Sequence, residues 1–182
     1  CEKIGDNREI GHYGLGHIYR CRGEYNNALY HMNRSIKIDE QLGNLDWVAG
    51  TQRNVAVLYS QMGDSEKALD YLQRSLCISR KLNNDVDVAI AFHIMGLVYH
   101  LSGEYDNALK YMERSLKMLE EVDSFRWTIC LPLFDLGRYN FDKGVYDKAI
   151  EYLEKSIVIQ RKVEFKVDGC LLWATTFLFL SY

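Results

Sequence analysis

The sequence predicts an all-α protein built as a solenoid of stacked antiparallel helix hairpins, and two observations support this prediction. A fourteen-residue pattern occurs four times, as GEYNNALYHMNRSI from Gly23, GDSEKALDYLQRSL from Gly63, GEYDNALKYMERSL from Gly103 and GVYDKAIEYLEKSI from Gly144. On both sides of each glycine, apolar residues recur at steps of three and four, which is the period of an α-helix. The glycines are 40, 40 and 41 residues apart, so each repeat is one supersecondary unit.

Each glycine is expected to form the turn between two helices. Glycine adopts the left-handed backbone that ends a helix at low steric cost. An Asp or Glu follows three of the four glycines, where the dipole of the next helix favours negative charge. The pattern therefore places one helix before the glycine and one after it.

Small and apolar residues keep fixed positions relative to these glycines. The small residues stand seven before and five after the glycine, and they let the two helices of a hairpin pack closely. A large apolar residue nine after it and a tyrosine four before it, in three units, fill the space between units. A hairpin of this kind cannot bury its apolar face alone, so neighbouring hairpins must stack.

The expected elements follow in order along the chain. The first hairpin pairs helices 8–22 and 25–42, and the second pairs 46–62 and 65–83. The third pairs 86–102 with 105–121, and the fourth pairs 126–143 with 146–163. The domain is therefore a single array, 1–182, with units at 8–42, 46–83, 86–121 and 126–163 and a partial fifth unit at 167–182.

Composition excludes several classes of protein. A chain of 182 residues with 48% hydrophobic residues can bury a sizeable core. The net charge is −3 and the charges are interspersed, so no basic stripe for nucleic acid is predicted. The most apolar stretch, 171–182, is shorter than the roughly 18 residues that a membrane span needs. Five scattered cysteines without a Cys-x-x-Cys pair indicate reduced thiols and a cytoplasmic location.

The repeat resembles the tetratricopeptide repeat. The segments LGHIYRCRGEYNNAL (15–29) and MGLVYHLSGEYDNAL (95–109) are close to that family's consensus. The common unit has 34 residues, and the longer unit here is similar to those of kinesin light chains and of microbial regulatory proteins. The resemblance implies a right-handed superhelix whose first helices line a concave face that binds proteins or peptides.

Both ends of the array are expected to be open. Residues 1–7 align with the end of a second helix, and 168–182 read as the first helix of a fifth unit without its partner. A terminal repeat is expected to carry a polar cap. The pattern therefore predicts either a fragment of a larger protein or self-association through the uncapped C-terminal helix.

The resemblance also implies which residues face the groove, when the family's groove positions are carried over by their distance from each glycine. The main candidates are Tyr13, His17, Arg20, Arg53, Asn54, Val57, Gln61, His93, Leu97, His100, Phe134 and Arg138. The same distances add Cys21, Ser60, Ile94, Leu101, Asp135, Phe141 and Asp142.

The expected groove has an apolar middle and cationic flanks, and it suits a protein or peptide segment with hydrophobic anchors and some acidic residues. Asn54 matches an asparagine that, in the longer-repeat relatives, hydrogen-bonds the backbone of an extended peptide. Its amide can both donate and accept hydrogen bonds. The alternative is that Ile94, Leu97 and Leu101 pack against another helix of the parent chain.

Catalytic, metal and cofactor chemistry is not predicted. His93 and His100 are seven residues apart, whereas a helical metal site usually has ligands one turn apart. Cys21 and His17 lie one turn apart, but a catalytic thiolate also needs a positioned base and an oxyanion site. Trp47, Trp127 and Trp173 are expected to wedge neighbouring units.

The sequence thus favours a non-catalytic, protein- or peptide-binding scaffold that holds an extended segment or a partner helix in its concave groove. The alternative function is a regulatory arm of a multidomain signalling effector, such as an ATPase, cyclase, kinase or protease, whose groove packs within its own chain. Enzyme activity within these residues is a weaker rival.

Overall fold

The structure is a computed structural model that describes residues 6–122 and 126–164. These residues form eight α-helices and no strand, and the all-α prediction is confirmed. No predicted helix boundary differs from the structure by more than two residues. The predicted fifth unit, 167–182, lies outside the described residues. The helices are α1 (Asp6–Cys21), α2 (Tyr25–Leu42), α3 (Leu45–Gln61), α4 (Ser65–Lys81), α5 (Asp85–Leu101), α6 (Tyr105–Glu121), α7 (Arg126–Asp142) and α8 (Tyr146–Glu164).

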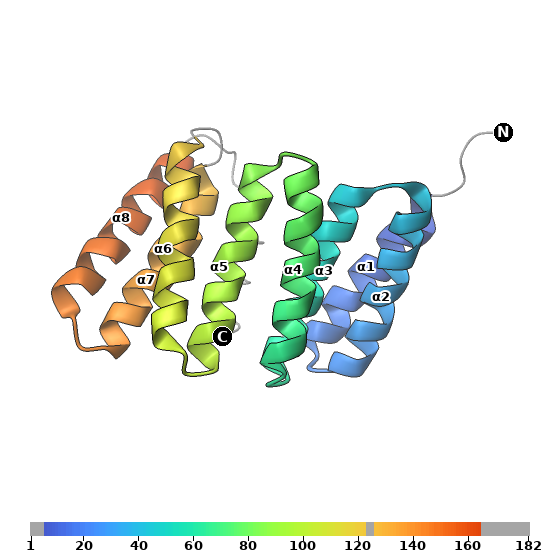
Figure 1. Ribbon diagram of the computed structural model, residues 1–182, viewed down its shortest axis with the longest axis horizontal. Helices are drawn as coiled ribbons and strands as arrows, with labels where there is room; N and C mark the ends of the chain where they lie inside the picture. Colours follow the sequence, from blue (N-terminus) through green and yellow to red (C-terminus); the bar gives the residue numbers. More distant parts are fainter. Residues whose placement is uncertain (1–5, 123–125, 165–182) are drawn as a thin grey trace.

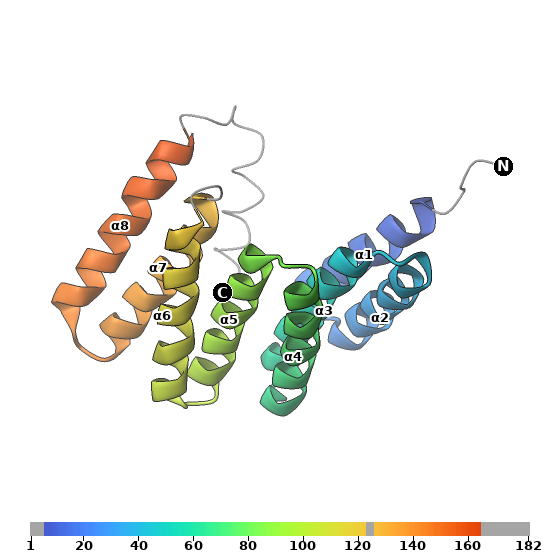
Figure 2. The same ribbon diagram turned by 45° about the horizontal axis from the view of Figure 1, so that its top comes forward.

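The helices form hairpins that stack in chain order. Each hairpin consists of two consecutive helices that pack against each other: α1 with α2, α3 with α4, α5 with α6, and α7 with α8. The second helix of each hairpin also contacts the first helix of the next one. The hairpins stand in a row from α1 and α2 at one end to α8 at the other (Figure 1). The row is twisted, so that α1 and α2 are inclined to α5 and α6 (Figure 2). This is the predicted α-solenoid.

The turn glycines have the predicted left-handed backbone, with φ between +75° and +81° at Gly23, Gly63, Gly103 and Gly144. The acidic residue after the glycine behaves in two ways. Asp64 accepts a hydrogen bond from the backbone N–H of Lys67 and caps α4. Glu24 makes no such cap and instead accepts from the side chain of Asn27, at 2.8 Å.

The small residue seven before the turn glycine sets how closely the two helices of a hairpin approach. A Cβ atom added to Gly96 would lie 2.6 Å from Cγ of Met112 and 3.1 Å from the backbone oxygen of Ala108. Gly16 and Gly137 face Met32 and Leu153 in the same way, at 2.7 Å. The hairpins therefore pack at a distance that only a small side chain permits.

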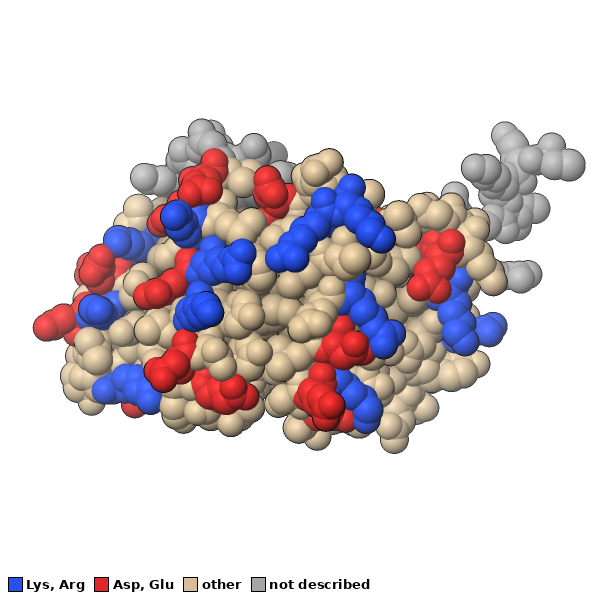
Figure 3. All heavy atoms as spheres, viewed as in Figure 1, with Lys and Arg blue, Asp and Glu red and all other residues tan. Residues whose placement is uncertain are grey.

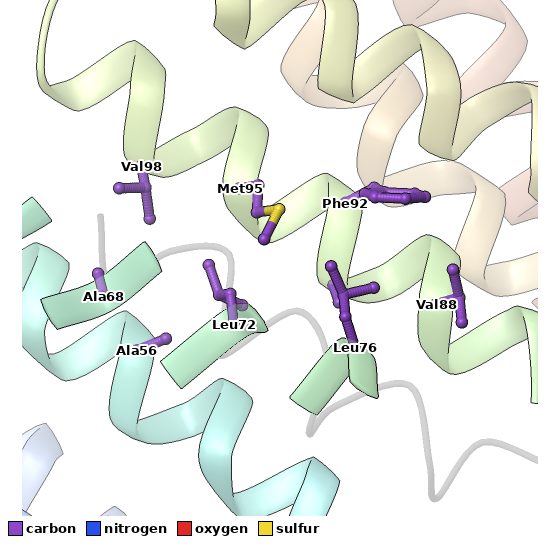
Figure 4. Close-up of a cluster of buried hydrophobic side chains, with 9 residues drawn as sticks. Ala56, Ala68, Leu72, Leu76, Val88, Phe92, Met95 and Val98 are labelled. Atoms are coloured by element: carbon purple, nitrogen blue, oxygen red, sulfur yellow. The ribbon is translucent and has the colours of Figure 1, made fainter. Parts of the chain in front are cut away.

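The core lies across the boundaries between hairpins. One cluster joins Leu72 and Leu76 of α4 to Val88, Met95 and Val98 of α5, and all of these side chains are buried. Figure 4 shows the side chains of α4 and α5 pointing toward one another across this boundary. Equivalent clusters join α2 to α3 and α6 to α7. Each hairpin therefore shares its core with its neighbours, as a solenoid requires.

A serine twelve residues after the turn glycine joins the two helices of a hairpin, a role that the sequence pattern did not reveal. Ser75 Oγ donates to the backbone oxygen of Ala49, at 2.9 Å, and Ser115 Oγ donates to that of Ala89, at 2.7 Å. Ser156 donates to Cys130 in the same way, at 3.2 Å. The serine hydroxyl therefore donates to a carbonyl near the start of the first helix of the same hairpin.

Acidic and basic side chains are interspersed over the face of the molecule shown in Figure 3. None of the described helices combines the length and apolar character needed to cross a bilayer.

Trp47 contacts Tyr13 of the preceding hairpin, with ring centroids 6.0 Å apart, in agreement with a wedge between units. The side chains of Trp127 and Trp173 lie outside the described part of the chain.

Candidate functional site

The candidate site is the face formed by the first helices of the hairpins. Helix α3 contacts α5, and α5 contacts α7, so these first helices form a continuous surface. All twelve candidate residues stand on first helices. They are Tyr13, His17 and Arg20 on α1, Arg53, Asn54, Val57 and Gln61 on α3, His93, Leu97 and His100 on α5, and Phe134 and Arg138 on α7.

Asn54 connects α3 to α1. Its Nδ2 donates to the hydroxyl oxygen of Tyr13, at 3.2 Å, and to the backbone oxygen of Gly50, at 3.3 Å. The Tyr13 ring packs edge-on against His17, with centroids 4.6 Å apart. Both N–H groups of the Asn54 amide therefore have acceptors, and its Oδ1 remains able to accept a hydrogen bond from a ligand.

Arg53 connects α3 to α5. Its Nη2 lies 2.9 Å from Oδ1 of Asp87, and both side chains are largely buried. Its Nη1 also donates to the hydroxyl of Ser75, at 3.5 Å. Asp87 was absent from the candidates because its distance from the turn glycine is not a groove position. The structure therefore gives Arg53 a contact that holds neighbouring hairpins together.

His93 and Asp135 connect α5 to α7. Nε2 of His93 lies 2.7 Å from Oδ2 of Asp135, and both residues are buried. The other carboxylate oxygen, Oδ1, lies 3.3 Å from Nη2 of Arg138. The pair occupies the same positions as Tyr13 and Asn54, namely ten residues before one turn glycine and nine before the next. Two expected ligand-binding residues are therefore engaged with Asp135.

Several polar atoms of this face are buried and have no hydrogen-bond partner among the described residues. They include Nε2 of His17, Nε of Arg20 and Nδ1 of His100. Burial lowers the pKa of His17, and the positive charge of Arg20 lowers it further. Burial also lowers the pKa of His100, with Arg138 as the next cause. At neutral pH these histidines are therefore uncharged and can donate or accept hydrogen bonds.

Among the positions predicted to face the groove, the exposed apolar side chains lie on α5 and α7. Leu101 is 63% exposed and Phe141 is 60% exposed, and Phe134 is also exposed. Leu97 is partly buried against the core cluster between α6 and α7. The apolar region therefore lies toward the α7 end, and Tyr13, Asn54 and Arg53 form a polar region toward the α1 end.

Two surface hollows occur at equivalent turns, outside this face. One, of about 440 Å³, is lined by residues 23–27 and Met62. The other, of about 490 Å³, is lined by residues 103–107 and Lys143, whose Nζ lies 3.6 Å from the centre of the Tyr105 ring. In the described residues, no three His, Cys, Asp or Glu side chains gather closely enough to hold a metal ion.

A family model described as tetratricopeptide repeat matches residues 8–81, 47–121 and 87–162, three overlapping windows that cover most of the chain. The chain belongs to the tetratricopeptide repeat family. Its 40-residue spacing makes it a long-unit member, and this resemblance, predicted from the sequence, is confirmed.

Solved structures share the fold of this tetratricopeptide repeat array. BtubC (BKLC) from P. vanneervenii has 19% identity and a TM-score of 0.70, with 93% of this chain and 69% of that chain covered. A Rap protein complexed with Competence and Sporulation Factor has 19% identity and a TM-score of 0.76, with 87% and 44% covered. The kinesin light chain-like repeats of Podosopora anserina have 18% identity and a TM-score of 0.60, with 89% and 80% covered.

These similarities concern the fold, and the share of each solved structure that this chain covers differs between them. The chain spans less than half the length of the Rap protein. No curated protein matches the sequence. The similarity to kinesin light chain-like repeats agrees with the long unit expected from the turn glycines.

Proposed function

We propose that this tetratricopeptide repeat array is a non-catalytic, protein-binding scaffold that holds an extended segment or a helix of a partner against its first-helix face. The observation that supports this proposal is the exposure of Leu101 and Phe141, two large apolar side chains on neighbouring first helices. Exposed apolar groups that adjoin polar groups on a rigid surface are typical of interaction sites. The complex between the structurally similar Rap protein and Competence and Sporulation Factor agrees with this function.

The chemistry of the face defines the segment that it would bind. Apolar side chains of the partner would contact Leu101, Phe134 and Phe141 at the α7 end. At the α1 end, Asn54 Oδ1 would accept a hydrogen bond from a backbone N–H of the partner. Arg138, whose side chain is 39% exposed beside Asp135, would attract an acidic group. The expected partner therefore has apolar anchors at one end and hydrogen-bonding backbone at the other.

The variants that test this function must leave the stack intact. Arg53 and Asn54 join neighbouring hairpins, so their substitution would alter both the face and the stack. Leu101→Asp and Phe141→Asp change exposed side chains only. The matched control is Val158→Asp, because Val158 is also exposed and apolar, with 49% of its surface accessible, but stands on the second helix α8.

The experiment compares wild type, the double variant L101D/F141D and the control V158D. Partners are first captured with the wild-type array and identified, and the affinity of each variant for the purified partner is then measured by calorimetry. We expect the double variant to weaken binding at least tenfold, because two apolar contacts are lost, and the control to bind as wild type does. Unchanged affinity of L101D/F141D, with a circular dichroism spectrum like that of wild type, would remove the proposal.

A further inference from the structure

The first hairpin places two histidines at positions where no other hairpin has one. His12 stands eleven residues before its turn glycine, and His31 stands eight residues after it. The residues at the position of His12 in the other units are Gln52, Phe92 and Leu133, and those at the position of His31 are Tyr71, Tyr111 and Tyr152. The packing of the repeat therefore needs no imidazole at either position.

The two histidine rings make a contact that aromatic rings make elsewhere in the array. The rings of His12 on α1 and His31 on α2 have centroids 5.1 Å apart and are tilted by 35°. In the third hairpin, Phe92 and Tyr111 stand at the same positions, with centroids 5.8 Å apart and a tilt of 39°. The geometry of the hairpin thus brings the two imidazoles together.

The two imidazoles are joined through their Nδ1 atoms. Nδ1 of His12 lies 2.9 Å from Nδ1 of His31, so one ring donates a hydrogen bond to the other. The ring of Tyr19 stacks on His31, with centroids 5.3 Å apart and a tilt of 12°, and Tyr30 packs edge-on against it. Packing on two sides therefore fixes the orientation of His31, while both imidazoles keep partial exposure to solvent.

The separation of these two nitrogens equals that of two adjacent ligands around one metal ion. Metal–imidazole bonds are about 2.0–2.1 Å long, so two nitrogens at a right angle around a metal lie about 2.9 Å apart, whereas a tetrahedral ion holds them about 3.3 Å apart. Right-angled arrangements of nitrogen and oxygen ligands are typical of Cu(II) and Ni(II), for which imidazole is a suitable ligand.

We propose that His12 and His31 form a binding site for a divalent transition-metal ion of this class, Ni(II) or Cu(II), which joins α1 to α2. Rotation of the His12 ring about its Cβ–Cγ bond directs the lone pairs of both Nδ1 atoms at one point. The proton of the donating Nδ1 moves to Nε2 of the same ring, so both ligating nitrogens are free and no net proton is released. Water fills the remaining coordination positions, because the protein supplies two ligands.

A metal ion at this site would stabilise the folded hairpin. The two histidines are 19 residues apart in the sequence and stand on different helices. The unfolded chain therefore does not hold their nitrogens at the separation that one ion requires. An ion that binds the folded chain in preference to the unfolded chain raises the stability in proportion to the logarithm of its concentration above the dissociation constant.

Arg34 limits the affinity of this site. Its positive charge acts against a positive charge at His12, and it stands on α2 one turn after His31. Arg34 is exposed, so its replacement leaves the packing of the hairpin intact. Arg34→Gln should therefore bind the metal ion more tightly than wild type does.

The test titrates the full chain, freed of metal ions by a chelator, with Ni²⁺ in a calorimeter. Ni²⁺ is the probe because Cys21 and Cys77 are exposed thiols, which Cu²⁺ would oxidise. We expect one Ni²⁺ per chain at this site, and a loss of affinity of at least tenfold in His12→Gln and in His31→Tyr, since each removes one of the two protein ligands.

Both variants introduce a residue that another unit already has at the same position, so they should fold as wild type does. Thermal unfolding gives a second readout. Ni²⁺ should raise the midpoint of the wild-type chain and leave the midpoints of His12→Gln and His31→Tyr unchanged. Cys77→Ser is the control, and it should bind Ni²⁺ and gain stability as wild type does.

The contrary outcomes are distinct. A wild-type chain that does not bind Ni²⁺ would leave the pair as a hydrogen bond between two helices only and would overturn the proposal. Unchanged affinity in both histidine variants would assign the ion to other side chains, and loss in one variant alone would show a single ligand; either result also overturns it. Tighter binding of Zn²⁺ than of Ni²⁺ would contradict the right-angled geometry and the metal class assigned from it.

This site goes beyond the proposed function and is independent of it. The two histidines lie between α1 and α2, whereas Leu101 and Phe141 stand on α5 and α7. The double variant L101D/F141D should therefore bind Ni²⁺ as wild type does, and His31→Tyr should bind the protein partner as wild type does.

Discussion

The carboxylate of Asp135 on α7 lies 2.7 Å from Nε2 of His93 on α5 and 3.3 Å from the guanidinium of Arg138. One carboxylate therefore has two nitrogen partners and joins two hairpins in a part of the molecule from which solvent is nearly excluded. Hydrogen bonds to a charged group in such an environment stabilise a fold more than those at the surface do.

Replacement of Asp135 by alanine should destabilise the array. The change leaves the buried Nε2 of His93 without its acceptor, and the expected loss in the free energy of unfolding is about 2–4 kcal/mol. Chemical denaturation of the variant measures this loss. Asp142→Ala is the control, because Asp142 is 48% exposed and lies 3.6 Å from His100, and it should cost less than about 1 kcal/mol. Equal effects of the two substitutions would contradict the interpretation.

Substitution of Gly96 by alanine should also destabilise the array, by about 1–3 kcal/mol. The added Cβ would meet Met112 at 2.6 Å and the backbone oxygen of Ala108 at 3.1 Å, so the two helices must separate. Gly14→Ala is the matched control in the middle of α1, where the Cβ meets nothing. It should stabilise the fold by about 0.5–1 kcal/mol through helix propensity. Thermal unfolding of both variants distinguishes the two glycines.

Asn83 provides a test of backbone conformation. It has φ of +53°, the only non-glycine residue with positive φ in the described part of the chain, and Gly43 stands at the equivalent helix end with φ of +75°. Asn83→Gly should leave the stability equal or raise it by up to about 1 kcal/mol, and Asn83→Ala should lower it by about 1 kcal/mol. A stabilising alanine at this position would be inconsistent with the left-handed backbone.

Acidification should destabilise the array through its half-buried histidines. His12, His17 and His100 all have a pKa below the ordinary 6.5 in the folded chain, chiefly because burial disfavours the charged imidazole. In the unfolded chain they bind protons near pH 6.5, so the unfolded state binds more protons than the folded state below that pH. Stability is therefore full above pH 6.5 and falls as the pH decreases through the lowered values.

The measurement is the urea midpoint between pH 7.5 and pH 5.5. His17→Gln should reduce the dependence of the midpoint on pH, because a glutamine at this position cannot titrate. An identical pH dependence in wild type and in this variant would show that His17 does not contribute to it.

The sequence predicted the fold closely because each hairpin is defined by local chemistry. The turn glycine fixes where one helix ends, and the periods of three and four fix which side chains are buried, so α2 and α6 were predicted with the observed ends. Asp64 and Glu24 show the limit of that reasoning. Both follow a turn glycine, but only the shorter Asp64 side chain reaches the backbone N–H three residues later.

The candidate site was predicted less completely. The repeat identified the first helices as the face and placed the candidate residues on it. The contacts of Arg53 with Asp87 and of His93 with Asp135 depend on how far one hairpin is rotated against the next, which a periodic pattern does not encode. The apolar middle and cationic flanks stay a prediction. Among the predicted groove positions, the exposed apolar side chains lie on α5 and α7.

The row of hairpins has a mechanical consequence. Extensive contacts in the described residues join only adjacent hairpins, with first helices α3, α5 and α7 in touch along one side. A small rotation at each boundary therefore adds to those before it, while the hairpins themselves keep their shape. Under tension applied to its two ends, such a row would lengthen like a spring, so the separation of distant points along it varies while the atoms within each hairpin barely move.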